Sequence, residues 1–152
     1  MKFVSIIMGS KSDYDVVSEA AKTLEKFNVP YELIISSAHR SPKRTSEYVA
    51  AAEEKGAQVF IAANTTRPVI GIPMAGSALS GVDALYSTVQ MPGGMPVGTV
   101  AIGKAGAVNA AYLALQILAL NDQNLDEMLK ADRAAKAKQV EDDSAKVEVL
   151  LA

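Results

Sequence analysis

The single histidine of the chain, His39, carries the side chain best suited to acid–base chemistry. An imidazole takes and gives a proton near neutral pH, and the neighbouring Arg40 supplies a guanidinium whose donors suit a phosphate or a carboxylate. These residues follow an apolar stretch, residues 31–35, and precede Ser41-Pro42, which is typical of a helix start. The arrangement predicts proton transfer on an anionic substrate, with His39 as the catalytic residue. The competing interpretation is an ordinary surface loop.

A second polar cluster follows the first apolar run, residues 3–8. Gly9 lets the backbone pass close to a ligand, and the N–H groups of a helix start suit an anion such as phosphate. We expect Ser12 to cap this helix and Asp13 to lie in its first turn. The competing interpretation is a turn and a capped helix without any ligand. The carboxyl ends of parallel strands meet at one edge of a sheet, so two such clusters favour one shared small ligand.

Apolar runs and helical repeats alternate along the chain. This alternation predicts an α/β domain with three layers and a parallel sheet of about five strands. The expected strands are residues 3–8, 31–35, 59–62, 69–73 and 98–102, and the expected helices are residues 12–27, 42–55, 80–89 and 105–120. The last of these helices is apolar on nearly every face, which predicts burial against both the sheet and a second subunit. We expect one catalytic domain over residues 1–152, with a helical tail from about residue 122.

Composition excludes several classes of function. A net charge of -2, with both signs of charge mixed along the chain, offers no basic face for a nucleic acid. Without cysteine and with one histidine, we expect no disulfide and no metal site. The apolar run at the N-terminus is too short for a signal peptide or a membrane span, which favours a cytoplasmic protein without a membrane partner.

Several longer motifs resemble those of the class I 5-(carboxyamino)imidazole ribonucleotide mutases of purine biosynthesis. These motifs are Gly9-Ser10-Lys11-Ser12-Asp13, Ser37-Ala38-His39-Arg40-Ser41-Pro42 and residues 68–73, 79–85 and 90–97. The resemblance runs from about Val4 to Leu120. It implies a flavodoxin-like fold, a homo-octamer, and an isomerase that uses no cofactor and no metal. The implied reaction moves a carboxylate of a ribonucleotide from the exocyclic nitrogen to C4 of the ring, through release and recapture of carbon dioxide.

The resemblance also implies roles for individual residues. His39 would be the proton shuttle, since one group that titrates near neutral pH can serve both halves of the reaction. The substrate-binding residues that it implies are Gly9, Ser10, Ser12, Asp13, Ser37, Ala38 and Arg40. Among these, the short anionic side chain of Asp13 suits the ribose hydroxyls better than the phosphate.

The chain departs from this family after the third expected strand. A glycine-rich loop with a second histidine, followed by a helix, is absent, and Ala62 and Ala63 run directly into residues 64–68. Parallel strands need a crossover of about a dozen residues, and about half that number separates the third and fourth strands. Either a segment of the natural protein is missing from this sequence, or the chain carries a true deletion, or the two strands form an antiparallel hairpin. We favour a missing segment, since both flanks suit parallel strands, and we predict a break between Ala62 and Asn64.

Three other functions are alternatives. A class II enzyme, which carboxylates aminoimidazole ribonucleotide directly, would share the fold and much of the site. A flavodoxin-like binding module would hold a flavin phosphate after the first strand, but the chain has no tryptophan and few aromatic residues to stack on a flavin. A signalling receiver domain would use Lys104, but it needs an aspartate at the end of the third strand, where residues 62–64 are Ala-Ala-Asn.

Overall fold

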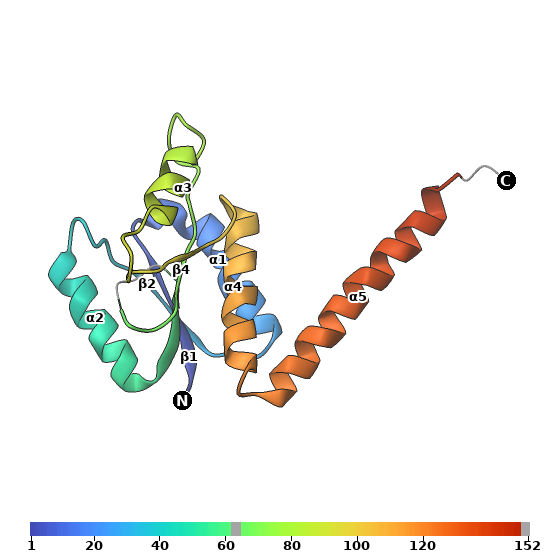
Figure 1. The fold of residues 1–152 in the computed structure, drawn as a ribbon, viewed down its shortest axis with the longest axis horizontal. Coiled ribbons are helices and arrows are strands. Elements are labelled where there is room, and N and C mark those ends of the chain that lie inside the picture. The colour runs from blue at the N-terminus through green and yellow to red at the C-terminus, as the bar shows by residue number, and fades with distance from the viewer. Residues whose placement is uncertain (62–64, 150–152) are drawn as a thin grey trace.

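The computed structural model describes residues 1–61 and 65–149, in which strands and helices alternate (Figure 1). The strands are β1 (Phe3–Met8), β2 (Tyr31–Ile35), β3 (Ala57–Ile61), β4 (Val69–Gly71) and β5 (Gly98–Thr99). The helices are a short 3₁₀ turn η1 (Lys11–Asp13) and the α-helices α1 (Tyr14–Lys26), α2 (Pro42–Lys55), α3 (Val82–Val89), α4 (Lys104–Ala119) and α5 (Gln123–Val147).

The five strands form one parallel sheet in the order β2-β1-β3-β4-β5. The predicted fold class is therefore confirmed. From β1 the chain first adds β2 on one side and then adds β3, β4 and β5 on the other side. The strand order therefore reverses between β1 and β3, and ligands of such sheets bind at this point.

The connection between β3 and β4 leads to a parallel pair. Phe60 lies opposite Val69 and Ile61 opposite Ile70 in parallel register, which contradicts the hairpin considered for these strands. The predicted break between Ala62 and Asn64 lies outside the described residues.

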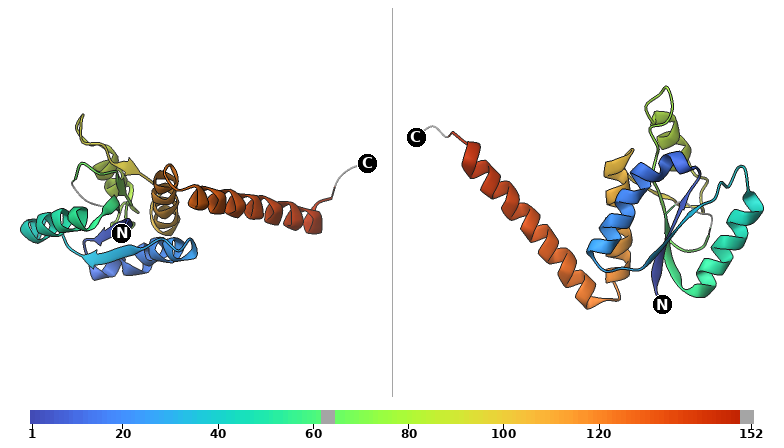
Figure 2. Two further views of the ribbon diagram at one scale, coloured as in Figure 1. Left: turned by 90° about the horizontal axis from the view of Figure 1, so that it is seen from below. Right: turned by 180° about the vertical axis from the view of Figure 1, so that it is seen from behind.

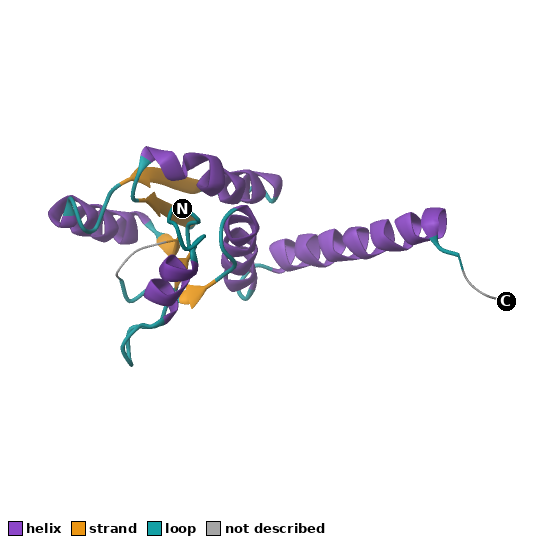
Figure 3. Ribbon diagram, turned by 90° about the horizontal axis from the view of Figure 1, so that it is seen from above, coloured by secondary structure: helices purple, strands orange, loops and turns teal. Residues whose placement is uncertain are grey.

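Helices cover both faces of the sheet and make the three expected layers (Figures 2 and 3). Alternate residues of β1 point to opposite faces. On one face, Val4 and Ile6 belong to a core shared with α1 and α4. On the other face, Phe3 and Ile7 pack in a smaller core with Val49 and Ala52 of α2. Because α2 is anchored here, the loop that precedes it has a fixed support.

Several boundaries differ from those predicted. Strands β4 and β5 end at Gly71 and Thr99, before residues 73 and 102, and α3 begins at Val82 instead of residue 80. Ser80 and Gly81 have φ angles of 53° and 89°, in the left-handed region, so a right-handed helix cannot include them. Hydrophobic periodicity does not reveal such backbone angles.

Helix α5 leaves the domain and projects from it as a straight arm (Figures 1 and 2). Near its start Leu125 is buried, and Met128 and Leu129 pack against the core, whereas Val140 and Val147 on the outer half are 69% and 78% exposed. No helix among residues 1–61 and 65–149 is long and apolar enough to cross a membrane.

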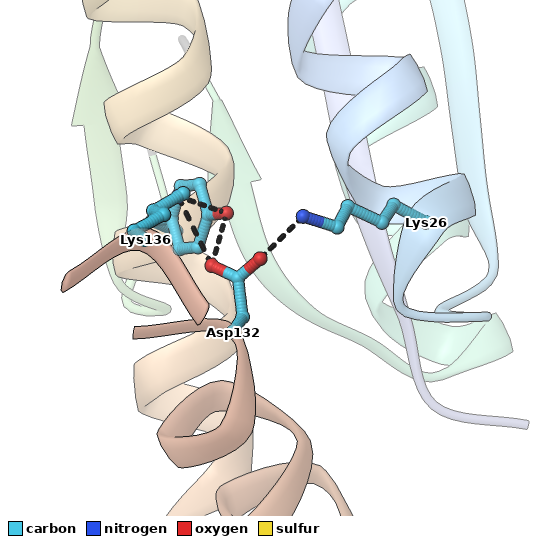
Figure 4. A network of polar contacts seen from close by, with 4 residues as sticks. Lys26, Asp132 and Lys136 are labelled. Atoms are coloured by element: carbon cyan, nitrogen blue, oxygen red, sulfur yellow. Dashed lines mark hydrogen bonds and ion pairs between the residues drawn. The ribbon is translucent and has the colours of Figure 1, made fainter. Parts of the chain in front are cut away.

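A largely enclosed carboxylate fixes the base of α5 to the domain (Figure 4). The side chain of Asp132 is 10% exposed and accepts hydrogen bonds from Lys26 of α1 and, at 2.7 Å, from Tyr112 of α4. It also forms an ion pair of 3.0 Å with Lys136, which donates a hydrogen bond of 2.6 Å to the Tyr112 hydroxyl. Burial acts to raise the pKa of Asp132, but these donors outweigh it and hold the pKa well below its usual range. The carboxylate is therefore ionised and paired at neutral pH.

Candidate functional site

The loop after β1 is shaped by Ser10, which caps η1. Its hydroxyl oxygen accepts hydrogen bonds from the backbone N–H of Ser12 at 3.3 Å and from the Ser12 hydroxyl at 2.9 Å. The prediction that Ser12 caps the helix is therefore wrong: Ser12 is the donor, Ser10 is the cap, and α1 begins only at Tyr14. The 3₁₀ turn between strand and helix moves the capping position two residues toward β1. Asp13 makes no side-chain cap hydrogen bond, so its carboxylate is not committed to the helix start.

The loop after β2 is a tight turn held together by Ser37. Its carbonyl accepts hydrogen bonds from the Ser41 backbone N–H at 2.7 Å and the Ser41 hydroxyl at 3.0 Å, and its own hydroxyl accepts from the Arg40 N–H at 3.2 Å. Ala38, His39 and Arg40 form the exposed tip of this turn. Helix α2 begins at Pro42, as predicted, although the Ser41 hydroxyl bonds to Ser37 and not to the helix N–H groups.

Arg40 joins the two loops directly. Its Nη2 donates a hydrogen bond of 2.6 Å to the carbonyl oxygen of Gly9, across 31 positions of sequence. A guanidinium has five N–H donors, so donors remain for an anion beside this contact. The structure thus brings the two predicted clusters to the same edge of the sheet, the upper edge in Figure 1. The arrangement can bind a small phosphorylated ligand and present an imidazole to it.

A third loop at this edge carries no predicted site residue. Residues 72–81 follow the carboxyl end of β4, and the carbonyl of Pro73 accepts a hydrogen bond of 2.9 Å from Gly103, before α4. The Ser77 hydroxyl donates to Asp83 at 2.6 Å and lowers the pKa of that carboxyl. The loop follows β4 at the carboxyl edge of the parallel sheet, and this position is the signal by which the sequence could have placed it at the same edge as the two predicted clusters.

A hollow beside these loops lies between η1, the start of α1, β2 and α2. Its volume is about 600 Å³, and it is lined by Met8, Lys11, Tyr14, Leu33, Ile34, Ile35 and Arg44. No predicted site residue contributes to its wall. Within the part of the chain that the structure describes, no three carboxylate or imidazole side chains gather closely enough to hold a metal ion.

Comparison with known proteins places the chain in a family. The sequence profile of the family described as AIR carboxylase matches residues 3–139. The chain belongs to the AIR carboxylase family. The N5-carboxyaminoimidazole ribonucleotide mutase of Escherichia coli K12 is 49% identical over 150 aligned positions, which cover 90% of this chain and 89% of the relative. The mutases of Bacillus subtilis and Pyrococcus horikoshii are 48% and 46% identical, covering 86% and 95% of this chain and 88% of each relative.

A solved structure supports the fold. The crystal structure of Treponema denticola PurE superposes with a TM-score of 0.77 at 23% identity and covers 98% of this chain and all of that chain. At this identity the likeness shows that the two chains share a fold.

The alignments also measure a difference in length. The 150 positions aligned with the Escherichia coli relative cover 90% of the 152 residues here, which is about 137, so about 13 positions of the alignment have no residue of this chain. This family member is therefore shorter internally than the relative that it matches nearly from end to end. A short connection between β3 and β4 fits that difference.

Proposed function

We propose that the chain is an N5-carboxyaminoimidazole ribonucleotide mutase, an isomerase of purine biosynthesis. The observation that carries the proposal is the identity of 45–49% to curated mutases over about 90% of the chain. This identity favours the mutase reaction over direct carboxylation, flavin binding or a signalling role.

The two loops joined by Arg40 hold the ribonucleotide in this proposal. Ser10, Ser12, Ser37 and Arg40 supply donors for its phosphate and carboxylate groups, and charge-assisted bonds from the guanidinium are the strongest of these. Asp13 accepts hydrogen bonds from the ribose hydroxyls. Gly9 and Ala38 have little or no side chain and let the substrate lie close to the backbone.

His39 then moves one proton twice. As the bond between the exocyclic nitrogen and the carboxylate breaks, its electron pair stays on nitrogen, which takes a proton from the imidazolium. Carbon dioxide is released. The ring carbon C4 next bonds to this carbon dioxide, and the neutral imidazole takes the proton that C4 loses. The proton balance closes without a cofactor, because the same imidazole gives and takes back one proton.

The direct test is conversion of N5-carboxyaminoimidazole ribonucleotide to the C4-carboxylated product by the purified protein. We expect turnover by the natural protein, together with substrate binding in isothermal titration. Absence of both binding and turnover would overturn the proposal. Carboxylation of aminoimidazole ribonucleotide by carbon dioxide, without conversion of the N-carboxylated substrate, would establish the class II activity instead.

The connection after β3 has its own test, the mass of the intact protein isolated from its source. The sequence as given has a mass of 16.0 kDa. If the natural protein contains an additional segment after β3, as we expect, its measured mass is higher. A mass of 16.0 kDa would mean a true deletion. Since carbon dioxide must be confined until recapture, a true deletion predicts weak turnover at most.

The proposal includes a homo-octamer as the assembled enzyme. It also includes a cytoplasmic location, since a phosphorylated substrate is retained there. Helix α4, expected at a subunit contact, is covered within one chain by α1 and α5, although Leu120 beyond its end is 81% exposed. Six large apolar side chains are exposed on and around α3: Leu79, Val82, Tyr86, Val89, Met91 and Met95. An apolar surface of this kind supports self-association. Light scattering on dilute protein should give the octamer mass, and a monomer mass would contradict it.

A further inference from the structure

Two pairs of hydroxyl groups connect α2 to β1 and to the residue after β2, and one of these pairs is tied to the loop of His39. Ser5, Ser36 and Thr45 are the buried polar residues among those that the structure describes. Ser36 bonds to Thr45, and Ser5 bonds to Tyr48, which lies one turn further along α2. These pairs have the same chemistry but different surroundings.

The direction of each hydrogen bond follows from counting protons. The hydroxyl of Thr45 has one proton, which it donates to the carbonyl of Ser41 at 3.1 Å. Ser36 must therefore be the donor in its 2.7 Å bond to Thr45. The Thr45 hydroxyl thus serves both as donor and as acceptor, and each of its partners lies at one end of the turn that carries the site residues.

This turn is defined at both ends. Ser36 directly follows β2, and its N–H donates to the carbonyl of Met8 at 2.9 Å, which ties it to β1. At the other end, Ser41 closes the turn on Ser37. The exposed tip between these ends holds His39 and Arg40, so its position depends on how Ser36 and Ser41 are held.

We propose that Thr45 is a positioning residue of the site, which locks both ends of the His39–Arg40 turn onto α2. This inference rests on the proposed function, since it assumes that His39 and Arg40 act on the substrate. Thr45 touches neither residue and acts through Ser36 and Ser41. Its support is rigid because Val49 and Ala52 of the same helix are buried in the second core. Reacting groups misplaced by about 1 Å can lose about 10²-fold in rate, so a buried anchor of this kind affects turnover.

The test compares Thr45→Val with Tyr48→Phe. Each change leaves one buried serine hydroxyl without its acceptor: Ser36 in the first variant and Ser5 in the second, because Tyr48 donates its own proton to Glu32 at 2.9 Å. Both variants should lose similar stability. We expect kcat to fall about tenfold in Thr45→Val and to change less than twofold in Tyr48→Phe. Thr45→Ser, which keeps the hydroxyl, should retain kcat within about twofold.

A double variant, Ser36→Ala with Thr45→Val, separates positioning from stability. It removes both members of the pair, so no unsatisfied hydroxyl remains and the melting temperature should recover toward that of the natural protein. We expect kcat to stay low, because Ser36 is still not bonded to α2 and the Ser41 carbonyl keeps only the backbone N–H of residue 45. Recovery of kcat together with stability would overturn the proposal.

The imidazole of His39 provides a readout that does not depend on turnover. In NMR spectra its side-chain signals are identified as those that disappear in the His39→Asn variant. These signals should shift or broaden in Thr45→Val and stay unchanged in Tyr48→Phe. Natural protein that does not convert the substrate contradicts the proposed function, whereas active natural protein with an unchanged Thr45→Val variant, in both kcat and histidine signals, contradicts the positioning role.

Discussion

The polar cluster at the carboxyl edge of the sheet and the cluster at the base of α5 use charge in opposite ways. At the edge, neutral hydroxyl and backbone groups shape each loop, and the charged side chain of Arg40 lies exposed beside His39 with one contact, to the carbonyl of Gly9. At the base of α5, the charge of Asp132 is buried and takes three donors from within the chain (Figure 4).

This difference shows which cluster has capacity left for a ligand. The carboxylate of Asp132 is committed to Lys26, Tyr112 and Lys136, and its lowered pKa reflects a structural role. The other large shift, the raising of the pKa of Tyr48 to about 12 by burial, also lies away from the loops of the site. In this chain, strong perturbation of a pKa marks groups that hold the domain together.

The largest expected effect concerns His39, which should matter for chemistry and little for stability. Replacing His39 by Asn keeps some hydrogen bonding but removes proton transfer near neutral pH, so turnover should fall by about 10²–10⁴ while the substrate still binds. A turnover assay beside isothermal titration measures both effects. Full turnover by this variant would show that the proton shuttle is elsewhere.

The next effect concerns Arg40, whose replacement should lower substrate affinity more than turnover. Replacing Arg40 by Ala removes charge-assisted hydrogen bonds and the link to Gly9, and should weaken substrate binding by roughly 1.5–3 kcal/mol, or about ten- to a hundred-fold. Arg40→Lys is the matched control: it keeps the charge but not the planar fork, so it should restore part of the affinity. Unchanged affinity in Arg40→Ala, measured by titration, would mean that this side chain does not bind the substrate.

The cluster at the base of α5 should give the reverse pattern. Replacing Asp132 by Asn removes two ion pairs and should lower the free energy of unfolding by about 1–3 kcal/mol, because both lysines are more than half exposed and lose only part of their interaction. For a chain of this size that corresponds to a fall in Tm of roughly 2–12 °C. Calorimetry measures it. An unchanged Tm would show that the cluster does not stabilise the domain.

The contribution of the Asp132 carboxylate to stability should also appear in the pH dependence of unfolding. The pKa of Asp132 is lower in the folded protein than its ordinary value of 3.8, so the unfolded state binds a proton first as pH falls. The stability that Asp132 contributes is present above about pH 4 and is lost as pH drops toward its folded pKa. Denaturant titrations between pH 7 and 3 should therefore show a smaller loss of stability in Asp132→Asn than in the natural protein. Equal acid dependence in the two would contradict the assignment.

The smallest effect is expected at a surface ion pair. Lys22 and Glu19 of α1 are 2.7 Å apart, with side chains 66% and 28% exposed. Replacing Lys22 by Ala should leave the Tm measured by calorimetry nearly unchanged, since exposed pairs are weak and screened by salt. A loss as large as that of Asp132→Asn would remove the distinction between the buried and the exposed pairs.

Much of the fold follows from the sequence. The apolar runs predicted all five strands, and Pro42 and Gly56 marked the ends of α2 correctly, because proline fixes φ at a helix start and the φ of 112° at Gly56 favours glycine. The sequence did not predict that Ser10, and not Ser12, is the cap, because serine is a good capping residue at both positions. Only the backbone path decides between them.

The sequence by itself determined the order of the elements, the two polar loops and the resemblance to the mutases, since each of these is written in residues close together along the chain. Tertiary structure alone decided the partners: Arg40 with Gly9, Thr45 with Ser36, and Asp132 with Lys26, which lies 106 positions away. It also confirmed the parallel pairing of β3 and β4, which the sequence favoured over a hairpin. The physical reason is that periodicity tells which face of an element is buried, whereas the group that meets a side chain across the core depends on how the layers pack.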